Sequence, residues 1–169
     1  MAVSTIVKNF AAGSLILKDG AGTPASLSVD FDNGDFSLSG LTKDLREVAK
    51  YERRGSLQSV AYGARTYPTG SFTAMMTQFT DSSAGTLADF LLKTGAFSSN
   101  VSTVGTGTAL PYTVQLVFTV EGTDFGDSAD HTFTLDDCRV SFDFSEGDPD
   151  SFSVSFEVLG AITGDLAAA

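Results

Sequence analysis

Several residue types that build reaction centres are scarce in this chain of 169 residues. It has a single cysteine, Cys138, a single histidine, His131, and no tryptophan. A lone cysteine excludes an intrachain disulfide and is compatible with a reducing compartment. A lone histidine excludes a zinc site built from several imidazoles. The lack of tryptophan argues against a sugar-binding surface, which usually offers a large aromatic platform.

Long apolar segments are also missing. No run approaches 18 consecutive apolar residues, so we expect no membrane-spanning helix and no membrane partner. The start, MAVSTIVKNFAAG, has neither a basic segment nor a long apolar one, so we expect no secretory leader. The length fits a single domain over residues 1–169 with a substantial core.

The few reactive groups do not form a catalytic pattern. Cys138 lies in phase with Val140 and Phe142, which predicts a core position, whereas His131 is expected at an exposed strand end. Three aspartates, Asp124, Asp127 and Asp130, suggest calcium, but their spacing misses the EF-hand template and its final glutamate. A solvated acidic loop is the favoured interpretation. We therefore expect no enzymatic activity, no metal and no cofactor.

Most of the sequence alternates polar and apolar residues, which is typical of half-buried strands. We expect strands at 14–18, at 26–39 as a hairpin around Asn33-Gly34, and at 70–80, 112–120, 131–145 and 151–160. The apolar phase changes at Asp136-Asp137, which predicts a β-bulge. The predicted fold is mainly β: an antiparallel β-sandwich or barrel-forming sheets, with one flanking α-helix and a long inserted loop.

One helix is predicted within the segment DSSAGTLADFLLKTG. Its N-cap candidates are Asp81, Ser82 and Ser83, its buried stripe is Leu87, Phe90 and Leu91, and Gly95 suits the C-cap. Residues 40–68 break the strand pattern and are expected to form a long irregular insertion, with a short helix possible around Leu45, Val48 and Ala49.

Charge is distributed unevenly. The net charge is −11, and residues 121–169 hold twelve acids and one base, Arg139. The insertion carries a cluster of cations: Lys43, Arg46, Lys50, Arg53, Arg54 and Arg65. A nucleic-acid patch is disfavoured because aromatic residues are not interleaved and Asp44, Glu47 and Glu52 dilute the charge. Two interpretations stay open: a solvated charged loop, or a head-to-tail contact between copies of this chain.

The order of these segments resembles the tail tube proteins (major tail proteins) of long-tailed bacteriophages. The resemblance covers nearly the whole chain: GSLILKDGAGTP, SLSVDFDNGDFSLSG, the charged insertion, TGSFTAMMTQFTDSSAGTLADFLLKTG and the closing TFTLDDCRVSFDFSEGDPDSFSVSFEVLG. In that family, subunits form hexameric rings that stack into a tube, and an insertion reaches the next ring. The resemblance implies an N-terminal arm at 1–12, a stacking loop at 40–68 carrying the six cations, and a C-terminal tail at 160–169.

The resemblance also implies a location and partners. The protein would be part of the virion tail, assembled in the host cytoplasm, with itself, a tape measure protein and tail tip or terminator proteins as partners. DNA would pass through an acidic channel without specific binding. Candidates for the channel wall are Ser141, Asp143, Ser153, Ser155 and Glu157, although these residues equally fit the solvent face of a sheet. The alternative function is a monomeric β-sandwich binding module, a virion decoration or adhesion domain, that uses the 40–68 loop.

Overall fold

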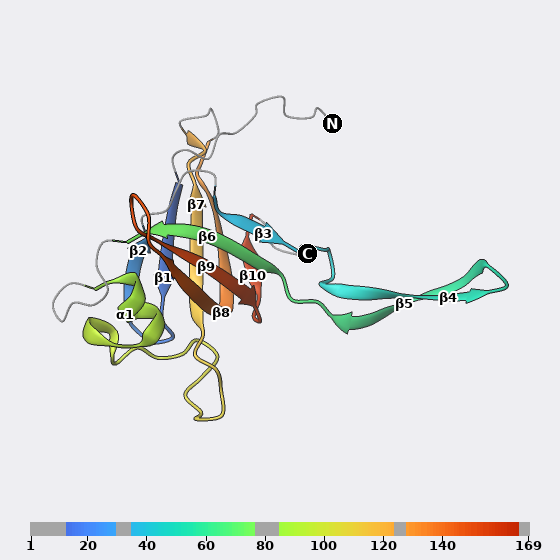
Figure 1. The fold of residues 1–169 in the computed structure, drawn as a ribbon. Coiled ribbons are helices and arrows are strands. Elements are labelled where there is room, and N and C mark those ends of the chain that lie inside the picture. Colours follow the sequence, from blue (N-terminus) through green and yellow to red (C-terminus); the bar gives the residue numbers. More distant parts are fainter. Residues whose placement is uncertain (1–12, 30–34, 77–84, 124–127, 166–169) are drawn as a thin grey trace.

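The protein is mainly β, with antiparallel strands and one short α-helix (Figure 1). The computed structural model describes residues 13–29, 35–76, 85–123 and 128–165. The strands are β1 (Gly13–Lys18), β2 (Ser26–Val29), β3 (Ser37–Ser39), β4 (Arg46–Arg53), β5 (Ser56–Arg65), β6 (Thr69–Met75), β7 (Val114–Val120), β8 (His131–Ser145), β9 (Ser151–Val158) and β10 (Ile162–Gly164). The helix is α1 (Leu87–Leu92), followed by the 3-10 turn η1 (Gly95–Phe97).

One sheet runs in the order β2-β1-β7-β8-β9-β6-β3, and β10 also pairs with β8. The long strand β8 joins its two halves: the ladder with β7 ends at Cys138, where the ladder with β9 begins. Between these halves, Leu135 and Cys138 face Leu116 and Val114, so β8 holds one extra residue and Asp137 adopts a φ of 51°. The predicted bulge at Asp136-Asp137 is therefore confirmed, and such a bulge bends a strand.

The core lies between the two halves of this folded sheet. The predicted inward residues of β7 and β9 are buried: Val114, Leu116, Phe118, Val120, Phe152, Val154, Phe156 and Val158. Phe36 lies between them, with its ring 4.3 Å from that of Phe118 and 5.7 Å from that of Phe156. Burying such side chains stabilises the fold by about 1.5–3 kcal/mol each, so this aromatic cluster helps to hold the two halves together.

The predicted hairpin at 26–39 is wrong. Strand β2 pairs with β1, whereas β3 pairs with β6, at the opposite end of the strand order. Asn33-Gly34 lies outside the described residues. Each strand takes the partner that brings its apolar side chain, Val29 or Leu38, against the core. Such tertiary packing outweighs a local turn preference.

The helix is confirmed, but its predicted caps are wrong. Thr86 is the N-cap: its hydroxyl accepts a hydrogen bond from the backbone N–H of Asp89. The candidates at 81–83 lie outside the described residues. Lys93, with a φ of 56°, is the C-cap, and Gly95 instead begins η1. Phe90 is fully buried and packs edge-on against Phe97, so the predicted stripe does anchor the helix.

Candidate assembly surfaces

Four strands present a shared polar surface, which we call the hydroxyl face. It consists of the second half of β8 with β9, β6 and β3, on the side away from the core. The cross-strand rows are Arg139–Glu157–Thr69–Ser39, Ser141–Ser155–Ser71–Ser37, Asp143–Ser153–Thr73 and Ser145–Ser151–Met75. The five predicted wall residues therefore lie on one face. The strand register adds five neighbours that the sequence does not predict: Ser37, Ser39, Thr69, Ser71 and Thr73.

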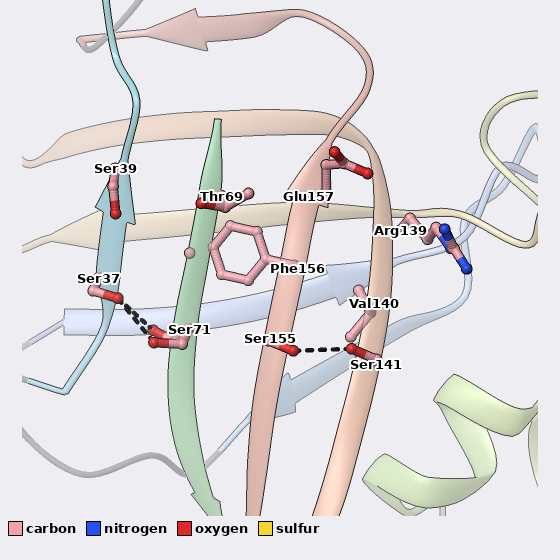
Figure 2. Close-up of a pocket in the computed structure, with 11 residues that line it drawn as sticks. Ser37, Ser39, Thr69, Ser71, Arg139, Val140, Ser141, Ser155, Phe156 and Glu157 are labelled. Carbon is pink, nitrogen blue, oxygen red and sulfur yellow. Dashed lines mark hydrogen bonds between the residues drawn. The ribbon is translucent and has the colours of Figure 1, made fainter. Parts of the chain in front are cut away.

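The centre of the hydroxyl face is hollowed into a shallow groove of about 580 Å³ (Figure 2). Two hydroxyl pairs cross it: the Oγ atoms of Ser141 and Ser155 are 2.9 Å apart, as are those of Ser37 and Ser71. These pairs join neighbouring strands, so the surface is ordered, uncharged over most of its area and fully able to bind water. It provides no cluster of reactive groups.

Charge on the hydroxyl face is sparse. Asp143 and Glu157 are acidic and Arg139 is basic, which sums to −2 + 1 = −1. Arg139 stands directly opposite Glu157 in the strand register, but its side chain points away from Glu157 in Figure 2. The predicted acidic surface is therefore only weakly acidic, because Arg139, the one base in residues 121–169, lies on it.

Among the described residues, the strands at both edges of the hydroxyl face have one side that pairs with no other strand. β3 pairs with β6 on one side, and no described strand pairs with its other side. The ladder between β8 and β7 stops at Cys138, so β7 does not cover the edge of β8 beyond that residue. Open strand edges invite pairing with another chain unless they are protected.

The cationic insertion is a β-hairpin, which we call the arm: β4, β5 and the turn between them. The expected short helix and irregular loop are both wrong. Arg54 and Gly55 form the two-residue turn, with φ of 52° and 78°, as a type I′ hairpin turn requires. Val48, Tyr51, Val60 and Tyr62 favour strands, and this combination of turn and propensity outweighs the helical spacing of three apolar residues.

Among the described strands, those of the arm pair only with each other, and the arm projects away from the rest of the molecule (Figure 1). One of its faces carries Val48, Val60 and Tyr62, whose side chains are 52%, 56% and 62% exposed. At its base, the Tyr62 hydroxyl donates a hydrogen bond of 2.6 Å to Asp44, and this bond raises the pKa of Tyr62. An isolated two-stranded hairpin is marginally stable in water, so these exposed apolar side chains favour a partner.

The six predicted contact cations occupy different parts of the insertion. Arg53 and Arg54 lie at the tip, Lys50 lies midway, and Lys43 precedes β4. Arg46 and Arg65 face each other at the base. Arg65 donates a hydrogen bond of 3.0 Å to the backbone carbonyl of Gly160 and lies over the ring of Tyr67, 5.3 Å from its centroid. Arg65 therefore anchors the arm, whereas Arg53 and Arg54 are exposed at its tip.

The reactive groups elsewhere are engaged in structural contacts. Cys138 is fully buried, as predicted, and burial raises the pKa of its thiol to about 12. His131 is partly exposed and lies 3.2 Å from the carboxylate of Asp165. Asp130 accepts hydrogen bonds from the backbone N–H groups of Thr123 and Gly122, which lower its pKa. Asp124 and Asp127 lie outside the described residues.

In the described part of the chain, no group of three or more metal-binding side chains is arranged to hold an ion. No helix there is long and apolar enough to cross a membrane.

Comparison with known proteins gives a distant structural similarity. No family model matches the sequence, and no curated protein matches it either. Among solved structures, a chain from the six-fold symmetrised cryo-EM structure of the anti-feeding prophage baseplate aligns over 97% of both chains, with a TM-score of 0.46 and 11% identity. At this level the alignment establishes neither family nor function, and the following conclusions rest on the surfaces described above.

Proposed function

We propose that this chain is a structural virion protein of a phage tail, which assembles into hexameric rings that stack into the tail tube. It has no catalytic role and needs no metal or cofactor. The hydroxyl face lines a conduit for the genome, and the arm joins successive rings. The single observation that carries the proposal is that one chain combines a polar four-stranded sheet, whose edges are unpaired among the described residues, with a projecting hairpin anchored only at its root in that part of the chain.

The open edges supply the ring contact. When β3 of one copy meets the β8 edge of the next, the four-stranded sheets join into a closed barrel and no exposed edge is left. Six copies contribute 24 strands. With a spacing of ~4.8 Å and a tilt of ~40°, such a barrel is roughly 48 Å across at the backbone. That width accommodates duplex DNA with side chains and water.

The composition of the hydroxyl face suits passage of DNA. A wall rich in lysine or arginine would pair with phosphates and hold the DNA. Serine and threonine hydroxyls with a slight excess of carboxylates keep the surface wet and weakly repulsive to phosphate. Within the virion tail, the tube would also contact a tape measure protein inside and tip and terminator proteins at its ends.

Sedimentation velocity over a concentration series tests the proposal, together with negative-stain microscopy of the same samples. We expect large assemblies and rods with a central channel at high concentration. A protein that stays monomeric at all concentrations and salts, even with a tail initiator complex, would contradict it. A saturable foreign partner for such a monomer would instead favour the binding module, which the exposed apolar residues of the arm also fit.

A further inference from the structure

The structure suggests where the arm binds, because the opposite end of the same strands carries a complementary surface. The turn between β8 and β9 contains Glu146, Asp148 and Asp150. Glu146 and Asp148 are exposed, while Asp150 accepts a hydrogen bond of 2.8 Å from the backbone N–H of Gly147 and so holds the turn in shape. We call this segment, 146–150, the acidic turn.

Exposed apolar side chains flank the acidic turn. Met75, the last residue of β6, pairs with Ser151 immediately after the turn and is 46% exposed. Phe144, two residues before Glu146, is also 46% exposed, but it pairs with Phe152 and so lies on the opposite face of the sheet from Met75. The arm carries two kinds of side chain, cations at its tip and an exposed apolar face. The acidic turn complements the cations, and Phe144 beside the turn complements the apolar face.

The positions of the two surfaces suit a repeating contact. The arm joins the body where β6 begins and where β9 ends, next to the Arg65–Gly160 hydrogen bond. The acidic turn lies where β6 ends and β9 begins, so the two surfaces are at opposite ends of the same strands (Figure 1). At ~3.4 Å per residue, the eight residues of β4 span about 27 Å, enough to reach well onto a neighbour.

We propose that the arm of one copy binds the acidic turn of a second copy of this chain, in a head-to-tail contact. Arg53 and Arg54 pair with Glu146 and Asp148, and the face formed by Val48, Val60 and Tyr62 covers Phe144, on the side of the sheet away from the hydroxyl face. The contact is heterologous, so it leaves an unoccupied arm at one end and an unoccupied acidic turn at the other, and it propagates. This inference rests on the proposed function, since it specifies how rings stack.

Disulfide trapping between two singly substituted full-length chains tests the contact directly. Arg53→Cys protein is mixed with Glu146→Cys protein and oxidised, and the covalent heterodimer is quantified on non-reducing gels. Buried Cys138 does not compete. Thr163→Cys, which replaces an exposed residue of β10 on the arm-root side, is the matched control partner. We expect efficient trapping with Glu146→Cys and at least tenfold less with Thr163→Cys.

Charge exchange provides the second measurement. Reversing Arg53 and Arg54 to Glu, or Glu146 and Asp148 to Arg, should each abolish assembly, while all four reversals in one chain should restore it. Circular dichroism verifies that each variant is folded. Rods that form without trapping of the disulfide between positions 53 and 146 would overturn this inference, while the proposed tube function would still stand. A disulfide without rods would support the contact and contradict the tube, and absence of the disulfide at every concentration overturns the inference in either case.

Discussion

The guanidinium of Arg65 donates a hydrogen bond of 3.0 Å to the backbone carbonyl of Gly160, 95 positions further along the chain. This bond connects the last residue of β5 to the segment between β9 and β10. The backbone bond from Thr66 to Leu45, 2.8 Å long, closes the base of the arm beside it. The arm therefore has a defined root, although its two strands pair with no other strand in the described part of the chain.

Replacing Arg65 with alanine should loosen the arm without unfolding the protein. A hydrogen bond from a charged group contributes about 1–2 kcal/mol when partly exposed, which corresponds to roughly tenfold faster amide exchange. Hydrogen exchange of β4 and β5 amides would measure the effect, with the melting temperature little changed. Arg46→Ala, which faces Arg65 in the register, is the matched control. Equal exchange in both variants would contradict an anchoring role for Arg65.

Gly70→Ala should destabilise the whole fold. A Cβ at Gly70 would lie 2.2 Å from the carbonyl oxygen of Ser37 and 2.3 Å from the ring of Phe156, so β3 and the ring both have to move. Overpacking of this kind usually costs about 1–3 kcal/mol in the free energy of unfolding. Denaturant titration would measure that loss.

Gly63→Ala in the arm is the control for Gly70→Ala. The three atoms nearest to a Cβ at Gly63 all belong to Glu47, at 3.2, 3.5 and 3.7 Å, so little has to move. The free energy of unfolding of this variant should change little. If Gly63→Ala destabilised the protein as much as Gly70→Ala, close packing between β3, β6 and β9 would not be the cause.

The thiol of Cys138 should be unreactive in the folded protein at pH 8 and react only on unfolding, because burial raises its pKa to about 12. Below about pH 9 the thiol is protonated in both states. Between about pH 9 and 12 the unfolded chain releases the proton first, so the free energy of unfolding falls as pH rises. Cys138→Ala should lack this part of the decline. Rapid labelling of native protein with a thiol reagent at pH 8 would contradict the buried position.

Changing the sign of the hydroxyl face should slow passage of DNA. Asp143→Lys with Glu157→Lys moves the net charge of the face from −1 to +3 in each copy, since each replacement adds two charges. Phage carrying this variant should assemble and package normally but eject DNA slowly, most clearly at low salt, where screening is weakest.

Arg139→Glu, which removes the base from the same face, is the control and should not slow ejection. Ejection rates that are unchanged across salt concentrations in the doubly substituted phage would place the hydroxyl face outside the channel.

Local patterns predict much of this fold. The strict alternation at 114–120 and 151–158 identifies both the strands and their buried faces, because one sheet face is apolar in each. The phase change at Asp136-Asp137 identifies the bulge, since one extra residue must reverse the alternation. These features depend on residues that are close in the sequence.

The features that the sequence did not predict depend on distant residues. Asn33-Gly34 indicates a turn, but the pairing of β3 with β6 depends on the packing of Phe36 and Leu38 against the core. The apolar residues of the arm have helical spacing and cover no core, so the sequence predicts an irregular loop where the structure has a hairpin. Arg54-Gly55, a two-residue turn between β-branched and aromatic residues, was the available signal for the hairpin. The hydroxyl face itself arises from the register of four strands, which no single segment encodes.

Cryo-electron microscopy of the protein assembled at high concentration tests the central claim most directly. The account predicts tubes of stacked six-fold rings in which Ser141 and Ser155 face the channel and the arm of each copy reaches the next ring. Tubes of another symmetry, a hydroxyl face turned to the outside, or particles that remain monomeric would contradict it.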